Sequence, residues 1–282
     1  MSGTLFVVAT PIGNLEDVTL RALRVLRTVA VIAAEDTRHT AKLLAHYAVQ
    51  TPTVSFHEHN TRSRIPQLLA RLERGEDVAV VTDAGTPSVS DPGLELVQAC
   101  VGRGIAVDVL PGPSAPLTAL VASGFPTTPV TVFDFAPVRS NDRIRFLQTV
   151  KDIPHTVIFF EAPHRIRNLL QEASTVLGDR PIVVARELTK VHQEVIRGSF
   201  SDILAALPTP RGEFTIVVGP RVKKASEVQP LPEPARLVDE FCRLTEIEGL
   251  SRRQAITRLA KDYNRPAREV YATLEEGKRL VE

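Results

Sequence analysis

The chain has 282 residues, 43% hydrophobic and 24% charged, which is ordinary for a globular protein and enough for two domains with separate cores. A formal net charge of +1 gives no bulk electrostatic sign of a nucleic-acid binder, and no segment approaches the roughly 18 consecutive apolar residues of a membrane span. Two cysteines without CxxC spacing argue against a disulfide framework or a zinc site, and the absence of a basic region before an apolar one predicts no signal peptide and a cytoplasmic protein.

Residues 1–125 alternate short apolar runs with amphipathic helical patterns. We predict strands at 5–10, 31–34, 53–56, 78–81 and 106–110, and helices at 20–29, 40–47, 64–74 and 94–103. This alternation is typical of a mostly parallel sheet covered by helices. We therefore expect an N-terminal α/β domain over 1–125.

A second α/β unit follows the segment 125–129, which has the composition of a hinge. We predict strands at 130–133, 156–160, 182–186, 194–197 and 214–218, and helices at 141–150, 165–177 and 201–207. The later strands are closely spaced along the chain, which favours some antiparallel pairing. The second domain is expected to span 126–222.

The C-terminal part begins with a proline-containing linker, predicted at 223–234. Three short helical patterns follow at 236–245, 252–263 and 267–276, with Ser251 as a predicted N-cap. Residues 235–282 therefore resemble a small helix-turn-helix-like module. Its segment 251–268 carries six basic residues and one acid. Charge alone leaves open whether this segment binds phosphates or is a solvated helical face.

The segment 81–93 follows an apolar strand and is the most informative loop of the chain. Gly85 and Gly93 allow positive φ or close approach of a ligand, and two prolines stiffen the path between them. We interpret the loop as ligand-binding, with Asp91 interpreted as a cap of the following helix. Other strands of the first unit also end in stiff or polar loops, at 10–15, 35–40 and 110–115. In a parallel sheet these ends share one edge, where ligands bind.

Other polar residues carry weaker signals. Asp36 or Thr37 is interpreted as a helix cap, whereas Glu35 and Arg38 have no such structural role and are expected to face the crevice. Arg186 and Lys190, near a strand end of the second unit, are candidates for holding an anion. His57 and His59 alternate along an extended segment without further ligands nearby, so we predict no metal.

Several motifs occur here in one order and together resemble a known family. They are Thr10-Pro-Ile-Gly-Asn-Leu15, Glu35-Asp-Thr-Arg-His-Thr40, Asp83-Ala-Gly-Thr-Pro87, Asp91-Pro-Gly93, Pro111-Gly-Pro-Ser-Ala115, Glu161-Ala-Pro-His-Arg165 and Ala185-Arg-Glu-Leu-Thr-Lys190. The combination resembles the bacterial small-subunit ribosomal RNA methyltransferases that methylate a cytidine 2′-hydroxyl, within the tetrapyrrole methylase superfamily. The segment Phe133-Asp-Phe-Ala-Pro137 departs from the family's usual Gly-Phe-Leu-Pro.

The resemblance implies an α/β fold of two domains with S-adenosylmethionine in the cleft between them. Carried over motif by motif, the expected cofactor-binding residues are Ile12, Gly13, Asp83, Ala84, Gly85, Thr86, Pro87, Val89, Ser114, Ala115, Phe160 and Leu188. It also implies 16S ribosomal RNA within the small ribosomal subunit as partner, and a homodimer.

Roles in catalysis and RNA binding follow from this expected reaction. We expect Glu35 or Glu187 to act as general base or to orient the ribose, because a ribose hydroxyl is a poor nucleophile. The expected phosphate-binding residues are Arg38, Arg186, Lys190, Arg252, Arg253, Lys261 and Arg265. Two alternatives stay open: methylation of a tetrapyrrole precursor by the same fold, and a non-catalytic RNA-binding factor of ribosome assembly.

Overall fold

The computed structural model describes residues 2–88, 91–207, 212–221 and 231–281. Contacts divide the chain into two compact units, Met1–Arg221 and Val222–Glu282. Most of the predicted linker at 223–234 lies outside the described residues. Within them, every helix is too short or too polar to cross a membrane.

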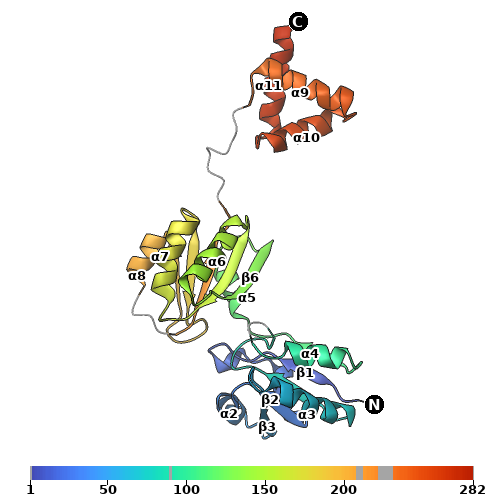
Figure 1. Cartoon of the computed structure of the whole chain (residues 1–282), viewed down its shortest axis with the longest axis vertical. Coiled ribbons are helices and arrows are strands. Elements are labelled where there is room, and N and C mark those ends of the chain that lie inside the picture. Colours follow the sequence, from blue (N-terminus) through green and yellow to red (C-terminus); the bar gives the residue numbers. More distant parts are fainter. Residues whose placement is uncertain (1, 89–90, 208–211, 222–230, 282) are drawn as a thin grey trace. The chain divides into compact units, whose positions relative to one another are not determined.

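The first sheet is a parallel one, as predicted. Its strands are β1 (Leu5–Val8), β2 (Val31–Ala34), β3 (Thr53–Ser55), β4 (Val78–Val81) and β5 (Val107–Leu110), in the order β3-β2-β4-β1-β5. All four neighbouring pairs are parallel. The loops that follow these strands therefore leave from one edge of the sheet (Figure 1).

Helices cover both faces of this sheet, which explains why its strands are apolar on both sides. They are α1 (Leu20–Thr28), α2 (Thr37–His46), α3 (Thr61–Glu73) and α4 (Leu94–Val101), and a short 3-10 helix, η1 (Leu15–Asp17), precedes α1. Helices α3 and α4 pack with Val7, Val31 and Val80 on one face. Helices α1 and α2 pack with Ile32 and Val81 on the other.

The second sheet is mixed, which confirms the expected antiparallel pairing. It contains β6 (Val130–Phe135), β7 (Thr156–Glu161), β8 (Ile182–Arg186), β9 (Glu194–Gly198) and β10 (Phe214–Val218), in the order β6-β7-β10-β8-β9. Only β6 and β7 pair in parallel. Helices α6 (Ser140–Asp152), α7 (Ile166–Leu177) and α8 (Phe200–Ala206) cover one face.

The other face of the second sheet is covered by α5 (Ala115–Ser123), which directly follows the last strand of the first sheet. Ala119 and Leu120 of α5 pack against Ile158, Val183 and Val217 of the second sheet. Although α5 precedes residue 125, it contributes to the core of the second sheet. The chain therefore crosses between the sheets at the loop after β5, which is one of the predicted ligand-binding loops.

The C-terminal unit is a small helical module with its own core. It consists of α9 (Pro234–Cys242), a π-helical turn (Arg243–Ile247), α10 (Arg252–Asp262) and α11 (Ala267–Val281). Leu237, Phe241, Leu259 and Val270 are among the residues buried where these helices meet. Ser251 caps α10 in a capping box with Gln254, as expected for the N-cap.

Candidate functional site

The loops after β1 and β4 are fastened to each other at the edge of the first sheet. Thr10 and Gly85 exchange two backbone hydrogen bonds, of 2.8 and 3.0 Å, and the Thr10 hydroxyl donates to the carbonyl of Thr82 at 2.9 Å. Gly85 has a φ of 79°, in the left-handed region that glycine tolerates. The glycine therefore allows the ligand-binding loop to turn back along β1.

A loop of the second sheet closes onto the loop after β1. A Cβ atom on Gly13 would lie 2.4 Å from Cγ of Lys190 and 2.7 Å from the carbonyl oxygen of Leu188. Ile12 and Leu188 belong to the same buried cluster. Glycine at position 13 is therefore what lets the two loops approach.

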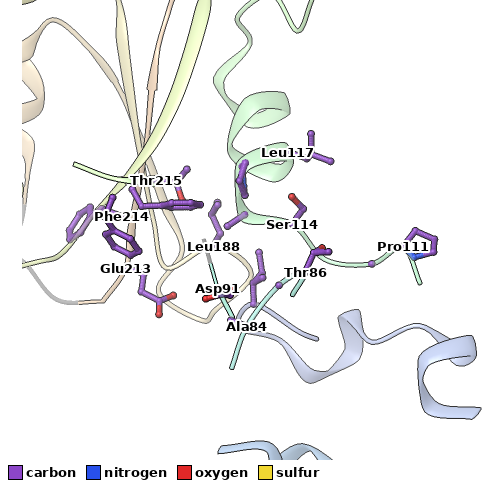
Figure 2. Close-up of a pocket in the computed structure, with 17 residues that line it drawn as sticks. Ala84, Thr86, Asp91, Pro111, Ser114, Leu117, Leu188, Glu213, Phe214 and Thr215 are labelled. Carbon is purple, nitrogen blue, oxygen red and sulfur yellow. The ribbon is translucent and has the colours of Figure 1, made fainter. Parts of the chain in front are cut away.

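A cavity of about 450 Å³ lies where these loops meet, within the range of roughly 300–1,000 Å³ for small-molecule sites. Loops of the first sheet line it with Ile12, Ala84, Gly85, Thr86, Asp91, Pro111 and Gly112. The start of α5 adds Ser114, Ala115, Pro116 and Leu117, and the second sheet and its loops add Phe135, Phe160, Leu188, Glu213, Phe214 and Thr215 (Figure 2). The cavity is therefore built from both sheets.

Most of the expected cofactor-binding residues line this cavity, namely Ile12, Ala84, Gly85, Thr86, Ser114, Ala115, Phe160 and Leu188. Gly13, Asp83 and Pro87 lie outside the lining, and Val89 lies outside the described residues. Ser114 occupies the N-cap position of α5 but makes no capping bond with its side chain. Its hydroxyl is therefore available to the cavity.

The interpretation of Asp91 as a helix cap is wrong. Helix α4 begins after Gly93, whose φ is 138°, and no side chain caps it. Pro92 and Gly93 thus place Asp91 two residues too early to reach the first turn. Asp91 instead lines the cavity, and burial raises its pKa to about 7, with repulsion from Glu35 as the next cause.

Glu35 and Asp83 belong to an acidic group beside the cavity. The backbone N–H of Asp83 donates to Oε2 of Glu35, and the backbone N–H of Asp36 donates to Oδ1 of Asp83, both at 3.2 Å. Burial raises the pKa of Glu35, and repulsion from Asp83 adds to it against the hydrogen bond from the Asp83 backbone. The ends of β2 and β4 are therefore joined by carboxylates.

The second candidate base, Glu187, is held differently. Its Oε1 atom accepts from Nζ of Lys190 at 2.9 Å and from the backbone N–H of Glu213 at 3.2 Å. Burial opposes ionisation, but these hydrogen bonds outweigh it and lower the pKa of Glu187. Glu187 is therefore an ionised anchor of its loop and a weak proton acceptor.

The three cations expected to bind phosphates beside the cavity all have carboxylate partners. The guanidinium of Arg38 pairs with Asp36 at 2.8 Å, and the same Asp36 also caps helix α2. Arg186 lies 3.4 Å from Glu194, and Lys190 lies 2.9 Å from Glu187. Any phosphate bound here competes with these partners.

The cations of the C-terminal unit fall into two groups. Arg252 pairs with Glu275 at 2.7 Å, and Arg265 pairs with Glu269 at 3.3 Å. Arg253 and Lys261 make no ion pair within the described part of the chain and share a groove along α10. The second group therefore presents the more available charge.

Several lining residues, including Phe135, Glu213 and Phe214, were not predicted from the sequence. Phe135 lies in the segment that departs from the family pattern, and its ring lies 5.5 Å from that of Phe160. No group of three or more potential metal ligands occurs in the ranges that the structure describes. The buried Nδ1 of His57 has no hydrogen-bond partner there.

Solved structures share this architecture. A diphthine synthase matches with a TM-score of 0.63 at 13% identity, over 78% of this chain and 91% of that one. A uroporphyrin-III C-methyltransferase from Thermus thermophilus, crystallised with S-adenosyl homocysteine, matches with a TM-score of 0.55 at 19% identity. The match covers 77% of this chain and 97% of that one. The fold is that of the tetrapyrrole methylase-like α/β proteins, as the motifs predicted.

Sequence comparisons identify the family within this fold. The family model described as Tetrapyrrole (Corrin/Porphyrin) Methylases matches residues 4–204. Two curated relatives are named ribosomal RNA small subunit methyltransferase I. The one from Synechocystis sp. is 43% identical over 95% of this chain and 96% of its own length. The one from Halalkalibacterium halodurans is 41% identical over 95% of this chain and 93% of its own length. The chain therefore belongs to the tetrapyrrole methylase family, in the group of ribosomal RNA small subunit methyltransferase I, which confirms the resemblance seen in its motifs.

Proposed function

We propose that this protein transfers a methyl group from S-adenosylmethionine to the 2′-hydroxyl of a cytidine in the decoding region of 16S ribosomal RNA. The relatives' name, over nearly the full length of both chains, supports a small-subunit RNA substrate. The single structural observation that carries the proposal is the cavity that both sheets line, with eight of the expected cofactor-binding residues around it.

The residues around the cavity fit such a cofactor. Ile12, Phe160 and Leu188 supply apolar surface for a nucleoside, and the lining glycines bring backbone groups close to a ligand. A Cβ atom on Gly112 would lie 2.8 Å from Cβ of Ala9, so the loop after β5 also depends on glycine. When bound there, S-adenosylmethionine supplies an electrophilic methyl group on a sulfonium.

The chain's own residues are proposed to position the ribose. Methyl transfer to oxygen requires an in-line approach, so holding the hydroxyl in place is the main demand. Glu35, fixed by the backbone N–H of Asp83, is suited to orienting the ribose. Arg38, Arg186 and Lys190 would hold neighbouring phosphates by exchanging their present carboxylate partners.

The C-terminal module is proposed to hold the RNA outside the cavity. Arg253 and Lys261 lie in one groove of α10, where a backbone phosphate would neutralise them. The target hydroxyl must enter a cavity, so the RNA is expected to be single-stranded or splayed at that nucleotide. Arg252 and Arg265 would contribute after releasing Glu275 and Glu269.

We also propose a homodimer that acts in the cytoplasm. The family resemblance of the motifs supports the homodimer. Val121 of α5 is 75% exposed and offers an apolar side chain to a second chain, whereas Leu117, one turn earlier, belongs to the cavity lining.

A labelled-methyl assay tests the proposed reaction. Immature small ribosomal subunits and free tetrapyrrole precursors are each supplied with labelled S-adenosylmethionine. Label in RNA supports the proposal. Label in the small molecules alone would favour the tetrapyrrole alternative, and no transfer to either would favour a non-catalytic assembly factor.

A further inference from the structure

Asp91 lines the cavity without serving the helix that follows it. Gly93 occupies the N-cap position of α4, and no side chain caps that helix. Pro92 separates Asp91 from this glycine. The Asp91 carboxylate is therefore half-buried at the ligand cavity for a reason other than helix stability (Figure 2).

Three other carboxyl groups lie close enough to Asp91 to repel its charge. Glu35 follows β2, Asp83 follows β4 and Asp134 lies in β6, and each repels its negative charge. The nearby Thr82 side chain partly offsets this repulsion by favouring the ionised carboxylate. No cation within the described ranges pairs with Asp91. Burial, the largest cause, and this repulsion hold its pKa at about 7, whereas an ordinary aspartate is a much weaker base.

The other titratable groups nearby are less suited to accepting a proton in the cavity. Glu35 lies outside the lining and holds the Asp83 backbone, and His57 also lies outside the lining. Glu187 is tied to Lys190. Glu213 lines the cavity, but its side chain is 75% exposed and lies 3.8 Å from Lys190.

We propose that Asp91 is the general base that removes the proton of the ribose 2′-hydroxyl. The inference deepens the proposed function and rests on it. The hydroxyl O–H bond breaks, and its electron pair stays on the oxygen as that oxygen bonds to the methyl carbon. The carbon–sulfur bond breaks with its pair going to sulfur, and the proton passes to the Asp91 carboxylate and then to solvent.

The test compares Asp91→Asn with Glu95→Gln in single-turnover methylation of immature small subunits at saturating cofactor. Glu95 lies four residues away, is exposed on α4 and loses the same charge. We expect Asp91→Asn to lower the rate by about 10²–10³-fold, the range for a lost general base, and Glu95→Gln to leave it within about twofold. Affinity for S-adenosyl homocysteine, measured by calorimetry, should stay within about threefold for both.

The pH dependence separates a base from a merely structural carboxylate. The wild-type rate should rise tenfold per pH unit below about 7 and level off above it, because only ionised Asp91 accepts the proton. In Asp91→Asn the rate should no longer rise with pH in this range. Asp91→Glu, which keeps a carboxylate, should retain this acidic limb of the pH profile and part of the rate.

Three results would overturn the assignment while leaving the proposed function intact. They are an Asp91→Asn rate within threefold of wild type, a pH limb that persists in Asp91→Asn, and equal loss of S-adenosyl homocysteine binding in Asp91→Asn and Asp91→Glu. The last result would make Asp91 a cofactor-binding residue. If the wild-type protein itself fails to methylate the subunits, the proposed function fails and this inference fails with it.

Discussion

Oε2 of Glu35 accepts the backbone N–H of Asp83 at 3.2 Å, so a carboxylate after β2 fixes the start of the loop after β4. This loop contains Gly85 and leads to Asp91, two lining residues of the cavity. The position of Glu35 therefore affects both the shape of the loop and the charge near Asp91.

Glu35→Gln is expected to shift the pH profile of methylation. Glutamine keeps an acceptor for the Asp83 N–H but removes a negative charge that raises the pKa of Asp91. A lower pKa keeps Asp91 ionised to lower pH, so the acidic limb of kcat/KM should move down by roughly one pH unit. The profile is measured between pH 5 and pH 9.

Glu16→Gln is the matched control, because Glu16 lies in the exposed 3-10 helix before α1. It should leave the acidic limb in place. A limb that stays at the wild-type pH in Glu35→Gln would show that the two carboxyl groups are not coupled.

Gly13→Ala is expected to weaken the closure of the loops around the cavity. The new methyl group would lie 2.7 Å from the carbonyl oxygen of Leu188, and this backbone atom can move only with its loop. Overpacking of this kind costs about 1–3 kcal/mol, so the melting temperature should fall and the affinity for S-adenosyl homocysteine should drop about tenfold or more. Calorimetry and thermal unfolding measure the two effects.

Gly102→Ala serves as the comparison, since Gly102 has an αR conformation and its nearest neighbour to an added Cβ is 3.3 Å away. It should leave cofactor affinity unchanged. If Gly13→Ala binds the ligand as tightly as this control, the close approach of the loops is irrelevant to the site.

Phe135→Ala tests the segment that departs from the family pattern. Phe135 lines the cavity, and its ring lies 5.5 Å from that of Phe160. If the ring of Phe135 contacts the bound cofactor, its loss removes an aromatic contact of about 0.5–1.5 kcal/mol and should weaken cofactor affinity roughly 2- to 12-fold. Val138→Ala, at a 74% exposed position outside the lining, should have no effect on this affinity. Equal affinities for the two variants would place the ligand away from Phe135.

The double variant Arg253→Ala/Lys261→Ala is expected to weaken RNA binding more than Arg252→Ala/Arg265→Ala. Each double variant removes two cations, but those of the second already have carboxylate partners. Loss of two phosphate contacts should reduce the slope of log K against log salt by about 1.4, and cofactor binding should be unchanged. Filter binding at several salt concentrations gives the slopes. Identical slopes for the first variant and wild type would remove α10 from the RNA-binding surface.

Local sequence patterns predicted the strand bounds well where an apolar run has clear ends. Strands 31–34, 78–81, 182–186 and 214–218 were predicted with their observed bounds, because apolar runs end at polar, glycine or proline residues. Helix α2 starts three residues before the predicted 40, since Asp36 caps it by accepting from the backbone N–H of Arg38. The parallel first sheet followed from the alternation of strands and helices.

Features that depend on the approach of the two sheets could not be predicted from local patterns. Helix α5 packs on the second sheet although its sequence follows the first, and Gly13 is required by a loop about 175 residues away in the sequence. The partners of Arg186 and Lys190 are local by comparison: Glu194 lies eight residues after Arg186 on the next strand, and Glu187 lies three residues before Lys190. The place of Asp91 in the cavity lining was missed because α4 begins only after Gly93, so Asp91 lies too far from the helix to cap it.

The position of the transferred methyl group on the RNA is the sharpest test of the proposed reaction. Immature small subunits are labelled with the wild-type protein and S-adenosylmethionine, and the 16S ribosomal RNA is then hydrolysed in alkali, which does not cleave after a 2′-O-methylated ribose. We predict that the label is recovered in one alkali-resistant dinucleotide that begins with cytidine. Label on a base or on any other nucleotide would contradict cytidine 2′-O-methylation.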